Sequence, residues 1–201
     1  MNREYLGFFG AFNPPTNAHI RLAEFALKAT GAKRVLFIPS KENYIRDFQG
    51  KDRAYGDREL LEMLRLAAET RPWMEVSDVE ILQESQPRTY ETLCRPRDAG
   101  KDAALLVGSD KLPELAEIWA HVDEIAREFG IVVLTRGADM CARMIRESAY
   151  LTSLSPYLKI LETPADTRNI SSTLVRSRVA QMKELQREIG AMVPQEILDL
   201  L

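Results

Sequence analysis

Short apolar runs alternate with helical patterns along almost the whole chain, and this alternation restricts the fold more than any other feature. A short continuous apolar run bounded by turn signals is typical of a strand that is buried on both faces, as in a parallel sheet. Strands are therefore predicted at residues 5–9, 34–38, 74–76, 103–107, 131–134 and 158–161, of which 74–76 has the weakest pattern.

Helical periodicity fills the intervals between these runs. Helices are predicted at residues 18–29, 58–69, 89–98, 112–128, 138–148 and 172–186. A regular strand–helix alternation favours an α/β fold: a Rossmann-like, doubly wound and mostly parallel sheet with helices on both faces. With 201 residues and 45% hydrophobic content, the chain can bury a full core as a single domain spanning 1–201.

Composition excludes several classes of protein. The formal net charge of -3 gives no electrostatic footprint for nucleic acid. Cys94 and Cys141 lie far apart and are expected to be ordinary reduced thiols. The N-terminal apolar run is too short for a signal peptide, and no window approaches the ~20 apolar residues of a membrane span. We expect a cytoplasmic protein that binds neither nucleic acid nor membranes.

The first strand leads into the turn GAFNPPTNAH, which has the properties of a phosphate-binding turn. Gly10 allows a close approach to the backbone, and the Pro14–Pro15 pair presets the backbone on the way in. Thr16 to His19 then place a hydroxyl, an amide and an imidazole where a helix would begin. Helix N-termini present unpaired N–H groups and a partial positive charge, which attract phosphate.

His19 is the candidate catalytic residue of this turn. It lies in the first turn of a predicted helix, where an imidazole can donate to a phosphate and follow its developing charge. His121, the other histidine, lies in a charged helical stretch and is interpreted as a surface residue. The simpler alternative is that Thr16 or Asn17 only caps the helix and that His19 is incidental.

A second candidate anion site opens the last predicted helix. Ser171, Ser172 and Thr173 offer consecutive hydroxyl groups, and Arg176 follows one turn later. The alternative is a well-capped amphipathic helix in which Ser171 is the N-cap. Two such sites in one small α/β domain indicate a ligand with several phosphates. The dinucleotide fingerprint G-x-G-x-x-G and the P-loop are both absent after the first strand.

The pairing of F-x-P-x-T-x-x-H with a late I-S-S-T-x-x-R resembles the nucleotidyltransferase superfamily with the (H/T)xGH motif. Within that superfamily the chain is most similar to the nicotinate/nicotinamide mononucleotide adenylyltransferases. The matching segments follow the order of the family across nearly the entire chain: FNPPTNAHIRLAEFA, DRELLEMLRLA, TYETL, VGSD, Trp119, NISSTLVR and VPQEILDLL.

The resemblance implies direct adenylyl transfer from ATP, with Mg²⁺ carried by ATP and no metal ligand from protein side chains. It implies catalytic roles for His19, Thr16 and Arg176, and a C-terminal helical part, about 171–201, that completes the ATP site. The implied ATP-binding residues are Gly10, Phe12, Asn13, Thr16, His19, Gly108, Asp110, Ser171, Ser172, Thr173 and Arg176. The implied mononucleotide-binding residues are Arg88, Thr89, Asp110 and Trp119.

The chain departs from the family pattern at three places. Ala18 stands where a glycine is usual, Pro87–Arg88–Thr89 replaces Ser-Tyr-Thr, and Trp119 lies one residue further from the Gly-x-Asp turn. Two of the three departures concern the mononucleotide side. The sequence does not determine whether the substrate is nicotinate or nicotinamide mononucleotide. It also leaves open whether the chain forms a homo-oligomer, and whether residues 41–56 form a substrate loop or a surface loop.

Two further functions remain compatible with the sequence. The chain could transfer a nucleotidyl group to another phosphate acceptor, such as phosphopantetheine. That branch is usually shorter and lacks the GSD…Trp and TYETL segments. A nucleotide-binding regulatory module without catalysis is the other alternative, although such a module would not require Thr16, His19, Asp110 and Arg176 together.

Overall fold

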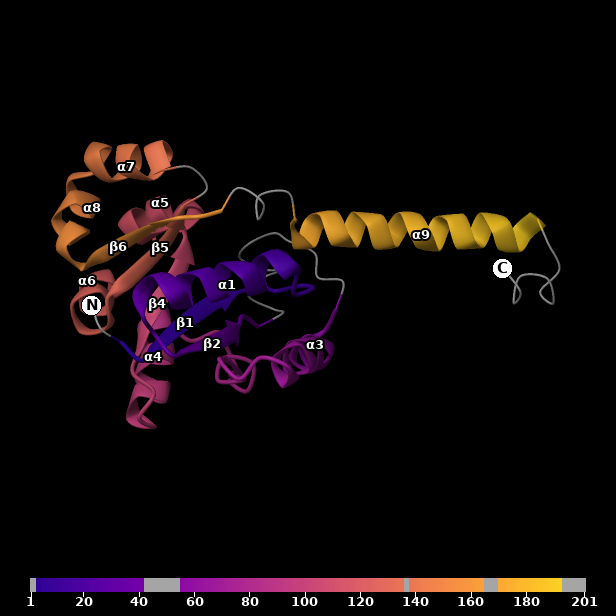
Figure 1. Ribbon diagram of the computed structural model, residues 1–201, viewed down its shortest axis with the longest axis horizontal. Helices are drawn as coiled ribbons and strands as arrows, with labels where there is room; N and C mark the ends of the chain where they lie inside the picture. Colours follow the sequence, from indigo (N-terminus) through magenta and orange to yellow (C-terminus); the bar gives the residue numbers. More distant parts are fainter. Residues whose placement is uncertain (1–2, 42–54, 136–137, 165–169, 193–201) are drawn as a thin grey trace.

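One parallel sheet of six strands forms the centre of the molecule (Figure 1). The computed structural model describes residues 3–41, 55–135, 138–164 and 170–192. The strands are β1 (Tyr5–Gly10), β2 (Arg34–Pro39), β3 (Met74–Val76), β4 (Ala103–Gly108), β5 (Ile131–Thr135) and β6 (Leu158–Glu162). Their order is β3-β2-β1-β4-β5-β6 and every pairing is parallel. This is the strand order of a doubly wound fold, and the predicted fold class is confirmed.

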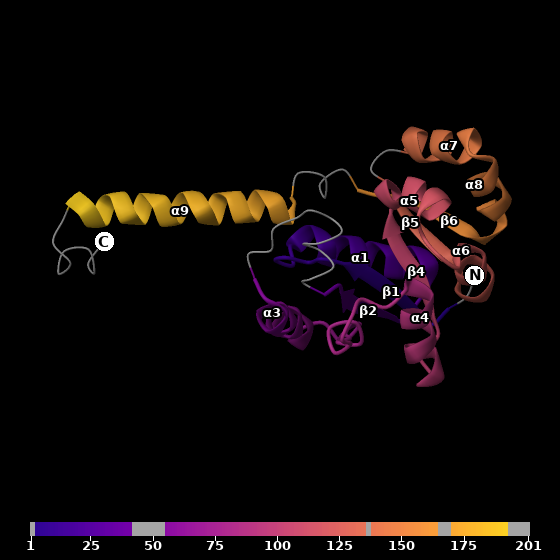
Figure 2. The same ribbon diagram turned by 180° about the vertical axis from the view of Figure 1, so that it is seen from behind.

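Helices cover both faces of the sheet (Figures 1 and 2). The helices are α1 (Asn17–Thr30), α3 (Asp57–Glu69), α4 (Thr89–Asp98), α5 (Leu112–Glu117), α6 (Val122–Glu124), α7 (Ala138–Glu147), α8 (Ala149–Leu154) and α9 (Ser172–Met192). Short 3₁₀ turns occur at Ser109–Lys111 and Ser155–Tyr157, and a π-helical turn at Ile125–Phe129. All six predicted strands are present.

The alternation of side chains along the strands creates two hydrophobic cores. Leu6 and Phe8 of β1 face α1 and α3, where they join buried residues such as Leu64. Leu105 and Val107 of β4 face the opposite side, towards α4 to α8. Because successive side chains of a strand point to opposite faces, the apolar runs supply both cores at once. Strands β2, β4 and β5 are therefore buried on both sides, whereas the edge strand β6 is partly exposed.

Local sequence explains where α1 begins and ends. Ile20, Ala23 and Ala26 are buried at helical spacing against the sheet. Thr16 caps the first turn through its hydroxyl oxygen, and Gly31 ends the helix in the left-handed conformation at φ 77. The same cap that starts the helix places His19 one turn in, beside the end of β1.

The prediction of one helix over residues 112–128 is wrong. α5 ends at Glu117, His121 adopts a left-handed conformation at φ 60, and the chain becomes helical again at Val122. Both halves bury their apolar side chains in the same core cluster. Helical periodicity cannot distinguish one long helix from two short ones that pack against a common core, so the break left no signal in the pattern.

Two other boundaries also differ from the prediction. The predicted helix 138–148 ends at Glu147, because the Ser148 hydroxyl accepts the N–H of Leu151 and so caps a new helix, α8. The last helix continues to Met192 instead of ending at 186. Of the predicted loop 41–56 and the predicted C-terminal part 171–201, residues 42–54 and 193–201 lie outside the described residues.

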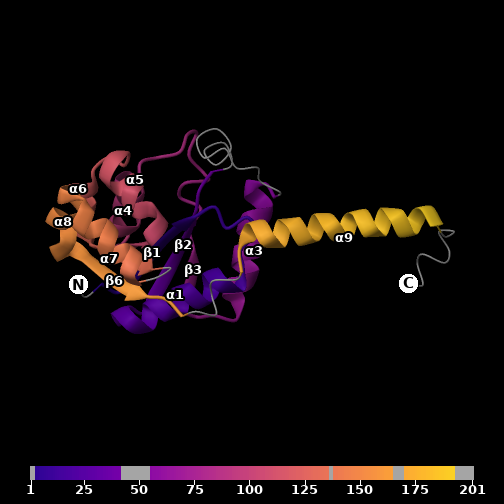
Figure 3. The same ribbon diagram turned by 90° about the horizontal axis from the view of Figure 1, so that it is seen from above.

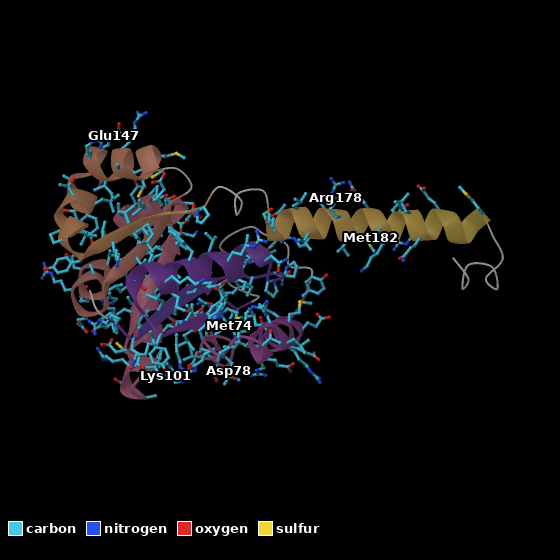
Figure 4. All side chains as sticks on the ribbon, viewed as in Figure 1. Met74, Asp78, Lys101, Glu147, Arg178 and Met182 are labelled. Carbon is cyan, nitrogen blue, oxygen red and sulfur yellow. The ribbon has the colours of Figure 1, made fainter. Side chains whose placement is uncertain are left out.

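Helix α9 extends away from the body of the molecule (Figures 1 and 3). Figure 4 shows Arg178 and Met182 on the part of α9 that stands clear of the sheet. Its first turn, by contrast, contacts the end of β1, as described below. Within the described ranges, none of the helices combines the length and apolar character that a bilayer crossing needs.

Candidate active site

The site is built where β1 and β4 end side by side. These strands are parallel neighbours, with Phe8 paired to Leu106, so that Gly10 and Gly108 end them at the same edge of the sheet. The strand order reverses between β1 and β4, and doubly wound sheets bind ligands in the crevice outside the carboxyl ends at that point. The structure therefore brings residues 10–19 and 108–110 to one edge of the sheet.

Phe12 forms the floor of the turn. Its side chain is 2% exposed, and its ring lies edge-on to Phe8 at 5.3 Å and to His19 at 5.2 Å between centroids. Its backbone has a positive φ of 43, which is uncommon for a residue other than glycine. A Cβ at Gly10 would lie 3.2 Å from the Phe12 ring. Gly10 thus leaves space for the ring that supports His19.

Asn13 anchors the turn to a distant part of the chain. Its side chain is 2% exposed; its Nδ2 donates to the carbonyl of Tyr55 at 2.7 Å, and its Oδ1 accepts the Tyr55 N–H at 3.3 Å. The peptide bond that follows, Asn13–Pro14, is cis. Tyr55 was not identified from the sequence. Its contact is a backbone one, made 42 residues along the chain, and such a contact leaves no local sequence signal.

The hydrogen bonds of His19 determine its tautomer. Nδ1 lies 3.1 Å from the backbone N of Thr16 and 3.0 Å from Thr16 Oγ1. A backbone N–H can only donate, so Nδ1 is the acceptor and the neutral ring carries its proton on Nε2. The Thr16 hydroxyl accepts the His19 N–H at 3.4 Å, which makes Thr16 the N-cap that the sequence allowed. The cap thus orients the histidine so that its Nε2–H is a donor.

The start of α9 contacts the same turn. The Ser172 hydroxyl donates to the carbonyl of Pro14 at 2.7 Å, and Arg176 Nη1 donates to the carbonyl of Asn13 at 2.7 Å. Arg176 Nη2 also donates to Thr173 Oγ1 at 3.2 Å. These residues lie more than 150 positions from the turn in sequence. The two candidate anion-binding segments are therefore in direct contact in the structure.

Ser171 has the role of a helix cap in this arrangement. Its hydroxyl accepts the N–H of Leu174 at 3.1 Å, as expected of an N-cap. The first turns of α1 and α9 consequently both begin beside the turn, and helix N-termini favour anions. The Arg176 guanidinium, bonded to the Asn13 carbonyl, and the imidazole of His19, bonded to Thr16, both lie next to this turn.

Gly108 and Asp110 form a compact pair after β4. A Cβ built on Gly108 would lie 2.3 Å from Asp110 Oδ1, far inside van der Waals contact. Any larger residue at 108 must therefore displace the Asp110 carboxylate. Asp110 lies in the 3₁₀ turn Ser109–Lys111 at the same edge of the sheet as Gly10. Its implied roles in binding ATP and the mononucleotide remain predictions.

The residues expected to contact a mononucleotide lie on the second-core face. Arg88 is exposed and precedes α4, and Thr89, which is half-buried, is its first residue. Trp119 lies in the break between α5 and α6, packs against the second core, and donates through Nε1 to Glu114 Oε2 at 3.3 Å. The contacts of Trp119 are those of a core residue, and its implied contact with the mononucleotide remains a prediction. His121 is exposed and lies 3.3 Å from Glu124 Oε1, in agreement with a surface role.

Glu80 was not identified from the sequence, and it is the most buried acidic side chain among the residues that the structure describes, with 1% exposure. Burial raises the pKa of its carboxyl to about 7, while hydrogen bonds from Gln86, Thr92 and Ser40 act in the opposite direction. A signal was present: Glu80 stands between the apolar residues Val79 and Ile81 in an otherwise polar stretch.

The donor set at the edge of β1 and β4 suits phosphate oxygens better than a metal ion. It consists of an imidazole N–H, a guanidinium and hydroxyl groups, with Asp110 as its acidic member. Divalent ions such as Mg²⁺ are bound by carboxylates, water and phosphate oxygens. Over the described part of the chain, no group of three or more His, Cys, Asp or Glu residues could hold a metal ion.

The sequence of the chain is similar to those of known nucleotidyltransferases. Residues 8–178 match the cytidylyltransferase-like family model. The chain is 30% identical over 187 residues to a probable nicotinate-nucleotide adenylyltransferase of Clostridium botulinum strain Okra, covering 92% of this chain and 90% of the relative. It is 26% identical over 190 residues to a protein of the same description from Caldicellulosiruptor bescii, covering 94% and 93%.

Solved structures show the same fold. The nicotinic acid mononucleotide adenylyltransferase of Plasmodium falciparum, complexed with NaAD, superposes with a TM-score of 0.64 at 14% identity. The match covers 87% of this chain and 83% of the other. The same enzyme complexed with APC gives a TM-score of 0.63 with the same identity and coverage.

The packing of Gly108 generates a first prediction. Gly108→Ala should weaken ATP binding by about 10-fold, because the new methyl group displaces Asp110 and a hydrogen bond to a charged group contributes roughly 1.5–3 kcal/mol. Titration calorimetry would measure the affinity. In an Asp110→Ala background the displaced group is gone, so Gly108→Ala should add nothing. An equal additional loss in that background would contradict this explanation.

The buried carboxyl of Glu80 generates a second prediction. Its folded-state pKa of about 7 lies above the ordinary glutamate value of 4.5, so the folded protein holds this proton more tightly than the unfolded chain. The resulting stabilisation is complete below pH 4.5 and is lost as the pH rises to about 7. At ~1.4 kcal/mol per pKa unit the loss is on the order of 3 kcal/mol.

Glu80→Gln should remove this pH dependence, because glutamine has nearly the same shape and does not titrate. Urea unfolding of both proteins from pH 5 to pH 8 would measure the difference. The free energy of unfolding of the wild-type protein should fall relative to that of the variant across this range. Parallel profiles for the two proteins would contradict the assignment.

Proposed function

The chain belongs to the nicotinate-nucleotide adenylyltransferase family, among the cytidylyltransferase-like proteins, and we propose that it joins ATP to nicotinate mononucleotide. The products are the deamido form of NAD and pyrophosphate, which makes the chain an enzyme of NAD biosynthesis. The proposal rests on the match of relatives along more than nine-tenths of the chain and on the site at the ends of β1 and β4.

The reaction requires no covalent intermediate with the protein. A 5′-phosphate oxygen of the mononucleotide attacks the α-phosphorus of ATP in line. The bond from the α-phosphorus to the bridging oxygen breaks, and pyrophosphate leaves with the electron pair. Such a transfer depends on positioning and on stabilising negative charge, since little covalent chemistry is left to the protein. A site made of donors and helix N-termini provides both.

His19 and the α9 residues have distinct parts in this proposal. The Nε2–H of His19 donates to the α/β-phosphates, with Nδ1 held by the backbone of Thr16. Ser172, Thr173 and Arg176 lie beside the β/γ-phosphates, where the guanidinium offsets the charge of the departing pyrophosphate. Mg²⁺ enters with ATP as part of the substrate and neutralises phosphate charge.

The acceptor side is proposed to lie at the start of α4. A nicotinate ring carries a carboxylate, which favours a cation or a helix N-terminus as its neighbour. The exposed Arg88 precedes the first residue of α4 and offers both features. Nicotinamide, which has a neutral amide in place of the carboxylate, would gain less from this position.

The observation that carries the proposal is the pair of hydrogen bonds from Ser172 and Arg176 to the turn that precedes His19. They connect the two segments that the sequence indicates as phosphate-binding. A general nucleotide-binding module needs one such pattern. Convergence of both, with a histidine oriented by its cap, supports transfer at a triphosphate.

The test is pyrophosphate release from ATP and Mg²⁺ with one acceptor at a time at pH 7. Nicotinate mononucleotide should give the highest kcat/KM, nicotinamide mononucleotide a lower value, and phosphopantetheine none. Absence of release with either pyridine mononucleotide from folded protein would reject the proposed function. Release with phosphopantetheine alone would assign the chain to another branch.

In the same assay, His19→Ala should lower kcat by at least ~10²-fold, the loss typical of one transition-state donor. The variant also loses the acceptor of the Thr16 N–H, so a small decrease in melting temperature is expected. Lys28→Ala is the control, because Lys28 is exposed in the last turn of the same helix, away from residues 10–19, and should keep its kcat. An unchanged kcat in His19→Ala would reject the role of the histidine.

A further inference from the structure

Three segments of the chain meet at the buried carboxyl group of Glu80, beyond the ends of β2 and β3. The Thr92 hydroxyl, which is itself fully buried, donates to Oε1 at 3.0 Å. The side-chain amide of Gln86 donates to Oε2, and the Ser40 hydroxyl also hydrogen-bonds the carboxyl group. Ser40 follows β2, Gln86 closes the segment after β3, and Thr92 belongs to α4.

A second layer of contacts ties the same segments together. Gln86 Oε1 accepts the backbone N–H of Lys41 at 3.0 Å, so that its amide bridges Lys41 and Glu80. Lys41 Nζ donates to the carbonyl of Ile81 at 2.8 Å and also to that of Gln83. Lys41, just after the end of β2, therefore holds the segment that follows Glu80 at Ile81, Gln83 and Gln86. Figure 4 labels Asp78, which lies near the beginning of this segment.

The position of Thr92 connects this cluster to the proposed acceptor site. Thr92 lies three residues after Thr89, the first residue of α4, and four after Arg88. Residues three and four apart are neighbours on one face of a helix, about one turn or 5 Å along its axis. A bond that fixes Thr92 therefore also fixes the direction and depth of the first turn of α4.

Burying a carboxyl group is energetically unfavourable, so stability alone does not explain why Glu80 joins these segments. Its described partners are neutral, two hydroxyls and an amide, and the nearby Lys41 Nζ is bound to backbone carbonyls. Desolvation is not offset by a cation, and well-packed apolar side chains often stabilise a core at least as well. What a carboxyl group adds is the ability to accept from three separate donors at once.

We propose that Glu80 is a positioning residue for the acceptor nucleotide, which joins the end of β2, the segment after β3 and the first turn of α4 so that Arg88 and Thr89 are presented in a fixed geometry. This inference rests on the proposed function and extends it to a side chain that touches no substrate. Glu80 acts through α4 and not on the phosphates of ATP. Loss of the Glu80 carboxyl group should therefore raise the KM for the mononucleotide and not the KM for ATP.

The test compares Glu80→Ala with Glu80→Gln in steady-state assays with ATP and nicotinate mononucleotide. Glu80→Ala should raise the KM for the mononucleotide by about 10-fold or more, since small displacements of positioning groups have large kinetic effects. The KM for ATP and the kcat should change less than about 2-fold. Glu80→Gln, which retains the shape but only one of the two accepting oxygens, should raise the mononucleotide KM less than Glu80→Ala does. Equal increases in both KM values, or no increase, would overturn the proposal.

Two further variants serve as controls for misfolding and for nonspecific effects of mutation in this segment. Thr92→Val removes only the buried hydroxyl donor and should raise the mononucleotide KM in the same direction as Glu80→Ala. Glu84→Ala removes an exposed carboxylate from the same segment and should leave both KM values unchanged. A normal mononucleotide KM in a folded Thr92→Val protein would count against the proposal.

Hydrogen exchange separates this proposal from the proposed function. Glu80→Ala should accelerate amide exchange in residues 86–92 and leave residues 10–19 unchanged, and Glu80→Gln should accelerate the exchange of residues 86–92 less than Glu80→Ala does. A wild-type protein that is inactive with the mononucleotide would reject the proposed function through the assay alone. Unchanged exchange in residues 86–92 would reject the role of Glu80 in either case.

Discussion

Hydrogen bonds from Ser172 and Arg176 to the carbonyl oxygens of Pro14 and Asn13 connect the last described helix to the first turn of the chain. The site depends on this connection, because it brings the N-termini of α1 and α9 to the same edge of the sheet. A carbonyl oxygen accepts strongly from a guanidinium, and these oxygens belong to a turn that the sheet cannot pair. The rest of α9 extends away from the body, so its first turn carries the contact described here.

Apolar packing supports one side of the turn formed by residues 10–19. Phe12 fills the space beneath His19 and contacts Phe8 and Phe37 of the first core. The backbone N–H of Thr16 donates to Nδ1 of His19 and holds the ring from its other side. Hydrophobic packing and a helix cap thus determine the tautomer and direction of the imidazole before any ligand binds. Preorganised donors of this kind need no reorganisation during the reaction.

The fold could be predicted from the sequence because buried parallel strands and amphipathic helices leave strong patterns, as β4 and α4 did. The break before His121 could not, since the two short helices share one core and one periodicity. In the site, His19 and Arg176 were found by their motifs. The contacts of Asn13 with Tyr55, and of Glu80 with Thr92, join distant segments and became visible only in the structure.

The central claim is that α9 and the histidine turn act on one bound triphosphate, and a double-mutant cycle tests it most directly. The kcat/KM for ATP would be measured for His19→Ala, Arg176→Ala and the double variant at saturating nicotinate mononucleotide. Groups that act as a unit give non-additive losses, so the double variant should lose clearly less than the product of the two single losses. Losses that multiply without coupling would contradict the claim.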